Sequence, residues 1–288
     1  MAFAVEHLSD YPRSKVCKIL NIPESTLRYH QTHNHKKTYP KQEEKLVLDM
    51  FKKHFGSFGR RTLKREIKKK HNVNISEYKI SKILKANGKS PKYGRKKGTN
   101  VHTNKDVSEK YIAENIFNQL KKADKIKDKK IWSTDFTEIK INGKKIFICG
   151  IISVNSKILV GLKISYKNNS QAATETLKTA IEKFGTPDII MSDRGSPFVS
   201  RSFKELLESN NIKHSMSRPY TPADNAYIET YWKSMKIEIG STKHLSEAEV
   251  RAIILYYEHY YNFERPHSTL GYCTPMERLY YQQKNRHM

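Results

Sequence analysis

Residues 131–166 read IWSTDFTEIKINGKKIFICGIISVNSKILVGLKISY, and this stretch decides the fold of the chain. Residues 131–141 alternate between apolar and polar side chains, which is typical of a half-buried strand. Asn142-Gly143 is the two-residue turn favoured in tight hairpins, and an apolar run over 146–154 follows it. With a further strand at 158–166, the stretch predicts a three-stranded antiparallel meander.

The chain beyond the meander alternates helices and strands. The pattern of apolar residues predicts a helix over 170–184, a short buried strand over 188–192 and a second helix over 202–209. Another strand and long helices complete the pattern. Strands added beyond a helical crossover predict an α/β domain with a mixed sheet.

Three acidic residues of this domain stand where chemistry is expected. Asp135 lies within the first strand, where burial of an unpaired carboxylate is costly. Asp193 ends the short strand, at the carboxyl edge of the sheet where ligand sites form. Glu229 borders the apolar face of a helix that begins near residues 224–225. Any one of these acids could be an ordinary turn or cap residue, but the three together favour a common site.

Carboxylates that converge on one point repel each other unless cations hold them, and hard oxygen ligands select magnesium or manganese. Two such ions, about 4 Å apart, activate an attacking water or hydroxyl and stabilise the leaving oxygen in phosphoryl transfer. We therefore expect Asp135, Asp193 and Glu229 to be catalytic ligands of Mg²⁺ or Mn²⁺, with two ions per active site.

Four motifs carry a resemblance to a known family: Trp132-Ser133-Thr134-Asp135, Ser192-Asp193-Arg194-Gly195-Ser196, Asp224-Asn225-Ala226-Tyr227-Ile228-Glu229 and Tyr261-Asn262-Phe263-Glu264-Arg265-Pro266-His267. They resemble the integrase-like catalytic domain of bacterial insertion-sequence transposases, the second-frame product of the two-frame family. The 35 residues between Asp193 and Glu229 match the spacing typical of this DDE superfamily. The resemblance covers about residues 131–279, and the front half resembles the helix-turn-helix regions that precede the domain in that family.

The resemblance implies a ribonuclease-H-like fold, with divalent-metal DNA cleavage and strand transfer at terminal inverted repeats. It also implies multimeric assembly on DNA and assigns the metal ligands to the same three acids. Lys236, seven residues past Glu229, matches the family's basic residue that contacts terminal DNA. Since seven residues of helix return to within about 20° of the same face, Lys236 and the intervening Lys233 are expected to continue a positive strip from the metal site.

The chain of 288 residues carries 54 Lys and Arg against 29 Asp and Glu, a formal net charge of +25. Residues 1–130 hold 33 of these basic residues and 13 acidic ones, whereas the remainder holds 21 and 16. A strongly basic front half attached to a nearly balanced back half indicates a DNA-binding region ahead of a second domain. A charge excess that only aids solubility is the alternative.

Two helix-turn-helix patterns lie in the basic half. One spans residues 14–31 with a break at 21–23, and the other spans 41–87 with a very basic middle helix. That helix could be only a solvated charged face, but its position after a glycine turn favours contacts with the DNA backbone. The candidate DNA contacts are Arg28, Arg60, Arg61, Lys64, Arg65 and Lys68, with Arg95, Lys96 and Lys97 in an extended basic arm.

These patterns predict a helix-turn-helix segment over 1–40, a second helix-turn-helix DNA-binding domain over 41–98, a linker over 99–128 and the catalytic core over 129–288. No apolar run is long enough for a membrane helix, and we expect a bacterial cytoplasmic protein that associates with the nucleoid when bound to DNA. Three widely separated cysteines exclude a disulfide framework and a cysteine-rich zinc site.

The predicted function is that of a transposase that binds the terminal inverted repeats of an insertion sequence and integrates DNA. Its expected partners are double-stranded DNA, further copies of itself and an upstream-frame product, and no membrane. A catalytically silent DNA-binding protein is one alternative, which the intact acids disfavour. A ribonuclease-H-type nuclease acting on hybrids is another, for which two basic helix-turn-helix units would be superfluous.

Overall fold

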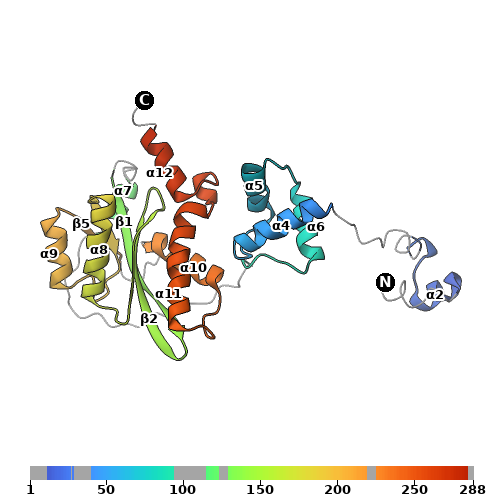
Figure 1. The fold of residues 1–288 in the computed structure, drawn as a ribbon, viewed down its shortest axis with the longest axis horizontal. Helices are drawn as coiled ribbons and strands as arrows, with labels where there is room; N and C mark the ends of the chain where they lie inside the picture. The colour runs from blue at the N-terminus through green and yellow to red at the C-terminus, as the bar shows by residue number, and fades with distance from the viewer. Residues whose placement is uncertain are drawn as a thin grey trace. The chain divides into compact units, whose positions relative to one another are not determined.

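The computed structural model describes residues 12–26, 28, 40–93, 115–122, 129–218 and 225–284 (Figure 1). The chain divides into two compact units, residues 1–48 and 49–288. In the first unit, α2 (Arg13–Leu20) ends at Asn21, which adopts the left-handed conformation with φ 48°. Val16 and Cys17 are buried there and pack with Ile22, as expected for the first helix of a helix-turn-helix segment.

The second unit is built on a five-stranded sheet of β1 (Ile131–Ile141), β2 (Lys144–Ser153), β3 (Leu159–Ser165), β4 (Ile189–Ser192) and β5 (Lys213–Met216). The strand order is β3-β2-β1-β4-β5. The pairs β1–β2 and β2–β3 are antiparallel, whereas β1–β4 and β4–β5 are parallel. This arrangement confirms the predicted meander with strands added beyond a crossover, which is a ribonuclease-H-like α/β core.

Helices cover both faces of the sheet (Figure 1). Because side chains alternate along a strand, Ile148 of β2 faces one layer and the adjacent Cys149 faces the other. The first layer holds α10 (Ala226–Ile239) and α11 (Glu247–His259), which runs on into the π-helical turn η3 (Tyr260–Glu264). The opposite layer holds α8 (Ser170–Phe184) and α9 (Arg201–Ser209). After the 3-10 turn η4 (Ser268–Leu270), α12 (Pro275–Lys284) contributes two partly buried side chains to the α8–α9 layer.

The end of the predicted linker packs against the core. Helix α7 (Ile116–Lys122) buries Phe117 beside Ile131 and Ile189. The backbone N–H of Phe117 donates to the Ser215 hydroxyl of β5 at 3.1 Å. The described part of residues 99–128 therefore contributes a helix to the domain, although its polar sequence favoured a simple connection.

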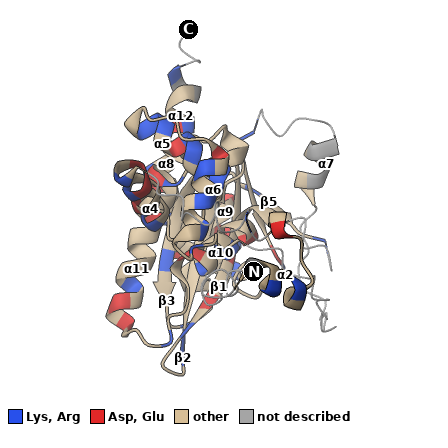
Figure 2. Cartoon of the chain, turned by 90° about the vertical axis from the view of Figure 1, so that its right-hand side faces the viewer, with Lys and Arg blue, Asp and Glu red and all other residues tan. Residues whose placement is uncertain are grey.

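Three helices precede the core: α4 (Lys41–Lys53), α5 (Arg60–His71) and α6 (Glu77–Ala86). Their bounds confirm the helices predicted for the second helix-turn-helix pattern. Leu63 and Ile67 of α5 and Ile80 and Ile83 of α6 are fully buried, while the Ser76 hydroxyl caps α6 by accepting from the Lys79 N–H. Along α5 and α6, most of the charged residues are Lys and Arg, and few are acidic (Figure 2).

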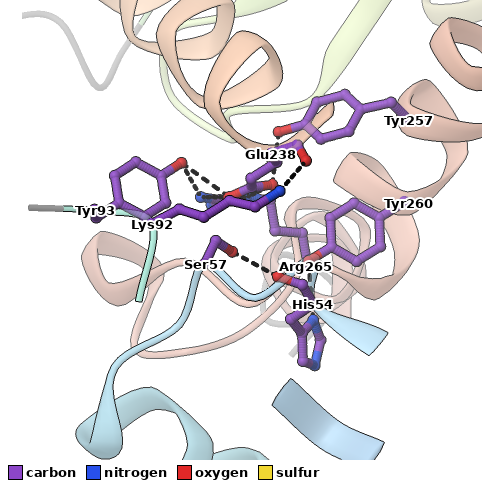
Figure 3. A network of polar contacts seen from close by, with 8 residues as sticks. All are labelled: His54, Ser57, Lys92, Tyr93, Glu238, Tyr257, Tyr260 and Arg265. Carbon is purple, nitrogen blue, oxygen red and sulfur yellow. Dashed lines mark hydrogen bonds and ion pairs between the residues drawn. The ribbon is translucent and has the colours of Figure 1, made fainter. Parts of the chain in front are cut away.

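A buried polar network joins this helical region to the core (Figure 3). The Glu238 carboxylate of α10 accepts from Arg265 Nη2 at 2.7 Å, and from the hydroxyls of Tyr93 and Tyr257 at 2.9 Å each. Lys92 Nζ donates to the Glu238 carbonyl at 2.9 Å. Since Glu238 lies on the helix that bears Glu229, the segment after α6 is fastened to that helix.

Among the residues that the structure describes, no helix combines the length and the apolar character needed to cross a lipid bilayer.

Candidate active site and nucleic-acid interface

Asp135 lies near the middle of β1, where its Cα is paired with that of Gly150 on β2. Burial, together with the nearby Asp193 and Glu229 carboxylates, raises the pKa of the Asp135 carboxyl to about 7. The Phe136 N–H and the Trp232 indole act in the opposite direction. A half-buried acid with such neighbours is poised to accept a cation.

Asp193 follows β4 directly, at the carboxyl end of a strand parallel to β1. The Gly195 N–H donates to Asp193 Oδ1 at 2.9 Å, which orients the carboxylate. Burial raises the pKa of Asp193, and the hydrogen bond from Gly195 opposes that rise. The hydroxyl of the preceding Ser192 is hydrogen-bonded to His214 Nε2 of β5 at 2.8 Å. This bond fixes the end of β4, from which Asp193 follows, to the neighbouring strand.

Glu229 lies in the first turn of α10 and is exposed. The helix begins against β1 because Asn225, which is buried, bridges the two elements. Its Oδ1 accepts from the Ser133 hydroxyl at 2.6 Å, and its Nδ2 donates to the Thr134 carbonyl at 3.1 Å. Asn225 thus links the start of the Glu229 helix to the two residues before Asp135. Sequence reasoning quoted Asn225 only as part of a motif and missed this role.

The three predicted acids are brought into one electrostatic neighbourhood. Burial raises the pKa of Glu229, and the Asp193 carboxylate adds to the rise, just as it does for Asp135. Within the described ranges, no three His, Cys, Asp or Glu side chains are gathered tightly enough to enclose a metal ion as they stand. The donor set nevertheless fits a hard cation, because carboxylates that raise one another's pKa are stabilised by positive charge between them.

The predicted DNA contacts on α10 lie as the helix period requires. Lys233 and Lys236 are exposed, like Glu229, so the three share one side of the helix. The pKa of Glu138 on β1 is lowered mainly by a hydrogen bond from Lys145. The Lys236 ammonium makes a smaller contribution in the same direction. The α10 surface next to the acids is therefore positive.

The predicted contacts on α5 have unequal surroundings. Arg60 Nε donates to Glu77 Oε2 at 3.3 Å, and Arg61 Nε lies 3.7 Å from the same oxygen. The Arg65 guanidinium stacks 4.4 Å above the Tyr272 ring, so its face of α5 packs on the C-terminal segment. Lys68 is exposed and Lys64 is half-buried.

Of the remaining candidates, Arg28 is exposed in the first unit, whereas Arg95, Lys96 and Lys97 lie outside the described residues. DNA contact by each of these side chains stays a prediction.

Comparisons with known proteins agree with the fold. Residues 127–222 and 210–275 each match a family model described as an integrase core domain. The chain is 26% identical over 274 residues to the InsK protein of insertion sequence element IS150 from Escherichia coli (strain K12), covering 93% of both chains. It is 28% identical to the transposase for insertion sequence element IS904 from Lactococcus lactis subsp. lactis (strain IL1403), covering 84% of this chain and 97% of that one.

Among solved structures, the HTLV-2 integrase catalytic core domain in complex with magnesium (trimeric form) is 21% identical, with a TM-score of 0.40. The match covers 51% of this chain and 94% of that chain. A similarity this loose adds no functional evidence.

A mixed five-stranded sheet with acids on β1, after β4 and on α10 defines an integrase-like α/β core. The similarity to transposases also extends beyond that core over most of the chain. The chain therefore belongs to the insertion-sequence transposases that have an integrase-like catalytic domain.

Proposed function

We propose that the protein is a transposase that binds the terminal inverted repeats of its insertion sequence and catalyses metal-dependent strand cleavage and strand transfer. The observation that carries this proposal is the placement of the three acids: Asp135 lies on β1, Asp193 follows the adjacent parallel strand β4, and Glu229 lies in the first turn of α10, which Asn225 holds against β1. A DDE polynucleotidyl transferase needs three such acids around its reacting phosphate. The transposase relatives and the integrase core models support the same reaction class.

Asp135, Asp193 and Glu229 would hold Mg²⁺ or Mn²⁺, in our proposal two ions per site. When bound, the ions supply activation of an attacking hydroxyl and stabilisation of the leaving oxygen. The protein's own share is positional. Gly195 orients the Asp193 carboxylate, and Asn225 holds the Glu229 helix against the strand of Asp135.

The surroundings of the acids suit a DNA backbone. Lys233 and Lys236 extend a positive strip along α10 from Glu229, and α5 and α6 add further exposed basic side chains. Phosphates attracted to this strip are guided toward the acids. We further propose that the protein acts as a homo-oligomer on DNA in the bacterial cytoplasm, alone or with an upstream-frame product.

The test is cleavage of a duplex that carries the element end by the full-length protein. Nicking should require Mg²⁺ or Mn²⁺, because repelling carboxylates cannot act without the cations. Asp135→Asn, Asp193→Asn and Glu229→Gln should each abolish nicking while DNA binding in a gel shift is retained. Cleavage in chelator, or by any of the three variants, would contradict the metal assignment. DNA binding without cleavage by the wild type would instead favour a catalytically silent DNA-binding protein.

A further inference from the structure

Trp232 lies one turn of α10 beyond Glu229 and packs against the sheet at Gly150. A Cβ atom at Gly150 would lie 2.5 Å from Trp232 Cη2 and 2.7 Å from its Cζ2, closer than side-chain carbons ever approach. The position therefore accepts only glycine while the indole stays where it is. Because Gly150 is the β2 partner of Asp135, the indole ring sits directly beside the candidate metal ligand.

The indole nitrogen of Trp232 is a buried donor. The side chain is only 5% exposed, and its Nε1 has no hydrogen-bond partner among the described residues. Leaving a buried donor without an acceptor costs about 1–3 kcal/mol of stability, which a hydrogen bond to a nearby acceptor would recover. As the β1 partner of Gly150, Asp135 presents its side chain on the same face of the sheet as the indole, which favours the charged form of the Asp135 carboxyl.

The α10 helix is thus held against the sheet at two places near Asp135, one on β1 and one on β2. At the start of the helix, Asn225 bonds to Ser133 and Thr134. Two turns later, Trp232 fills the space above Gly150, held edge-on by the Tyr231 ring at a centroid distance of 4.9 Å. Neither contact uses the carboxylates of Glu229 or Asp193.

We propose that Trp232 is a positioning residue, whose indole N–H donates to the inner oxygen of Asp135 and fixes the orientation in which the outer oxygen binds metal. This inference rests on the proposed function, since it concerns the way Asp135 holds a cation. Donors that orient metal-binding carboxylates commonly change metal affinity by 10–100-fold when they are removed.

The test separates the N–H from the ring. The full chain is prepared with benzothienylalanine at position 232, which keeps the bicyclic shape and replaces the N–H with sulfur, and in parallel as Trp232→Phe. Trp132→Phe is the matched control, because Trp132 is the chain's second tryptophan and is equally buried on the other layer of the sheet. Metal binding is read from the rise in melting temperature during Mg²⁺ and Mn²⁺ titrations, without any substrate.

Both Trp232 variants should need about tenfold more metal for half-maximal stabilisation than the Trp132→Phe control. Their nicking should show the same increase in metal requirement, with unchanged DNA binding in a gel shift. In the Trp132→Phe protein Trp232 is the sole tryptophan, and its fluorescence should change saturably with metal and lose that response when Asp135→Asn is added.

A benzothienylalanine protein with the metal affinity of the control overturns the inference, even if Trp232→Phe misfolds. Proposed function and inference fail separately. If the wild type neither gains stability nor cleaves DNA when metal is added, both are refuted. If the wild type depends on metal but loss of the Trp232 N–H leaves its metal affinity unchanged, only the role of Trp232 is refuted.

Discussion

Removing the Arg265 guanidinium should cost this protein more stability than almost any other single side-chain change outside the apolar core. Arg265 is 9% exposed and Glu238 is fully buried. The single Nε–H of Arg265 is shared between the two Glu238 carboxylate oxygens at 3.1 Å each, and Nη2 donates to Oε1 at 2.7 Å. Arg265→Met keeps most of the side-chain volume, yet among the described residues it leaves the Glu238 carboxylate with the hydroxyls of Tyr93 and Tyr257 as partners.

Breaking a buried ion pair by removing one partner costs about 3–5 kcal/mol, because a charge remains in a medium that solvates it poorly. For a unit of this size each kcal/mol lowers the melting temperature by roughly 2–4 °C. Arg265→Met should therefore lower the melting temperature by about 6–20 °C in a calorimetric scan.

Arg201→Met provides the control, since Arg201 Nε makes an equally short contact of 2.7 Å to Glu205 on the surface. That pair is exposed and should give no measurable shift. If both variants melt at the wild-type temperature, the Glu238–Arg265 pair does not hold the helical region on the core, and the reasoning from burial is refuted.

Three further predictions concern stability and DNA handling. Burial lowers the pKa of His54 and His267 to about 3 and of His214 to about 4, so the folded protein resists protons that the unfolded chain accepts below its ordinary histidine pKa near 6.5. Their stabilising contribution is complete above that pH and declines as the pH falls. The urea midpoint of wild type should therefore drop more steeply between pH 6.5 and 5 than that of His54→Gln. Equal slopes would show that His54 does not contribute to the pH dependence of stability. Gly150→Ala should destabilise by about 1–3 kcal/mol through overpacking against Trp232, whereas Gly59→Ala, which meets nothing within 4 Å, should be nearly neutral in the same denaturant titration. Lys236→Ala should reduce strand transfer at limiting DNA, with partial recovery when DNA is raised and no change in metal dependence; a defect cured by manganese and not by DNA would place Lys236 at the metal.

The elements of this fold could be predicted from sequence because their signals are local. The Asn142-Gly143 turn and the alternation around it determine the β1–β2 hairpin within a few residues of chain. The helical period of α10 predicts that Lys236 lies on the same face of the helix as Glu229, and both side chains are exposed. Burial is less local: of the neighbouring tyrosines at the end of α11, Tyr257 and Tyr260 are fully buried, whereas Tyr256 is half exposed.

The sequence by itself therefore determined the order of strands and helices and the three acids offered to a common site, because turn chemistry and periodicity act between near neighbours. Tertiary structure alone decided which groups support those acids. Asn225 meets Ser133 across 92 positions, and Tyr93 meets Glu238 across 145. It also turned Arg65, expected at DNA, onto the Tyr272 ring. Such partners are chosen by burial, since a polar group removed from water binds whichever complementary group the packed chain places beside it, at any distance in sequence.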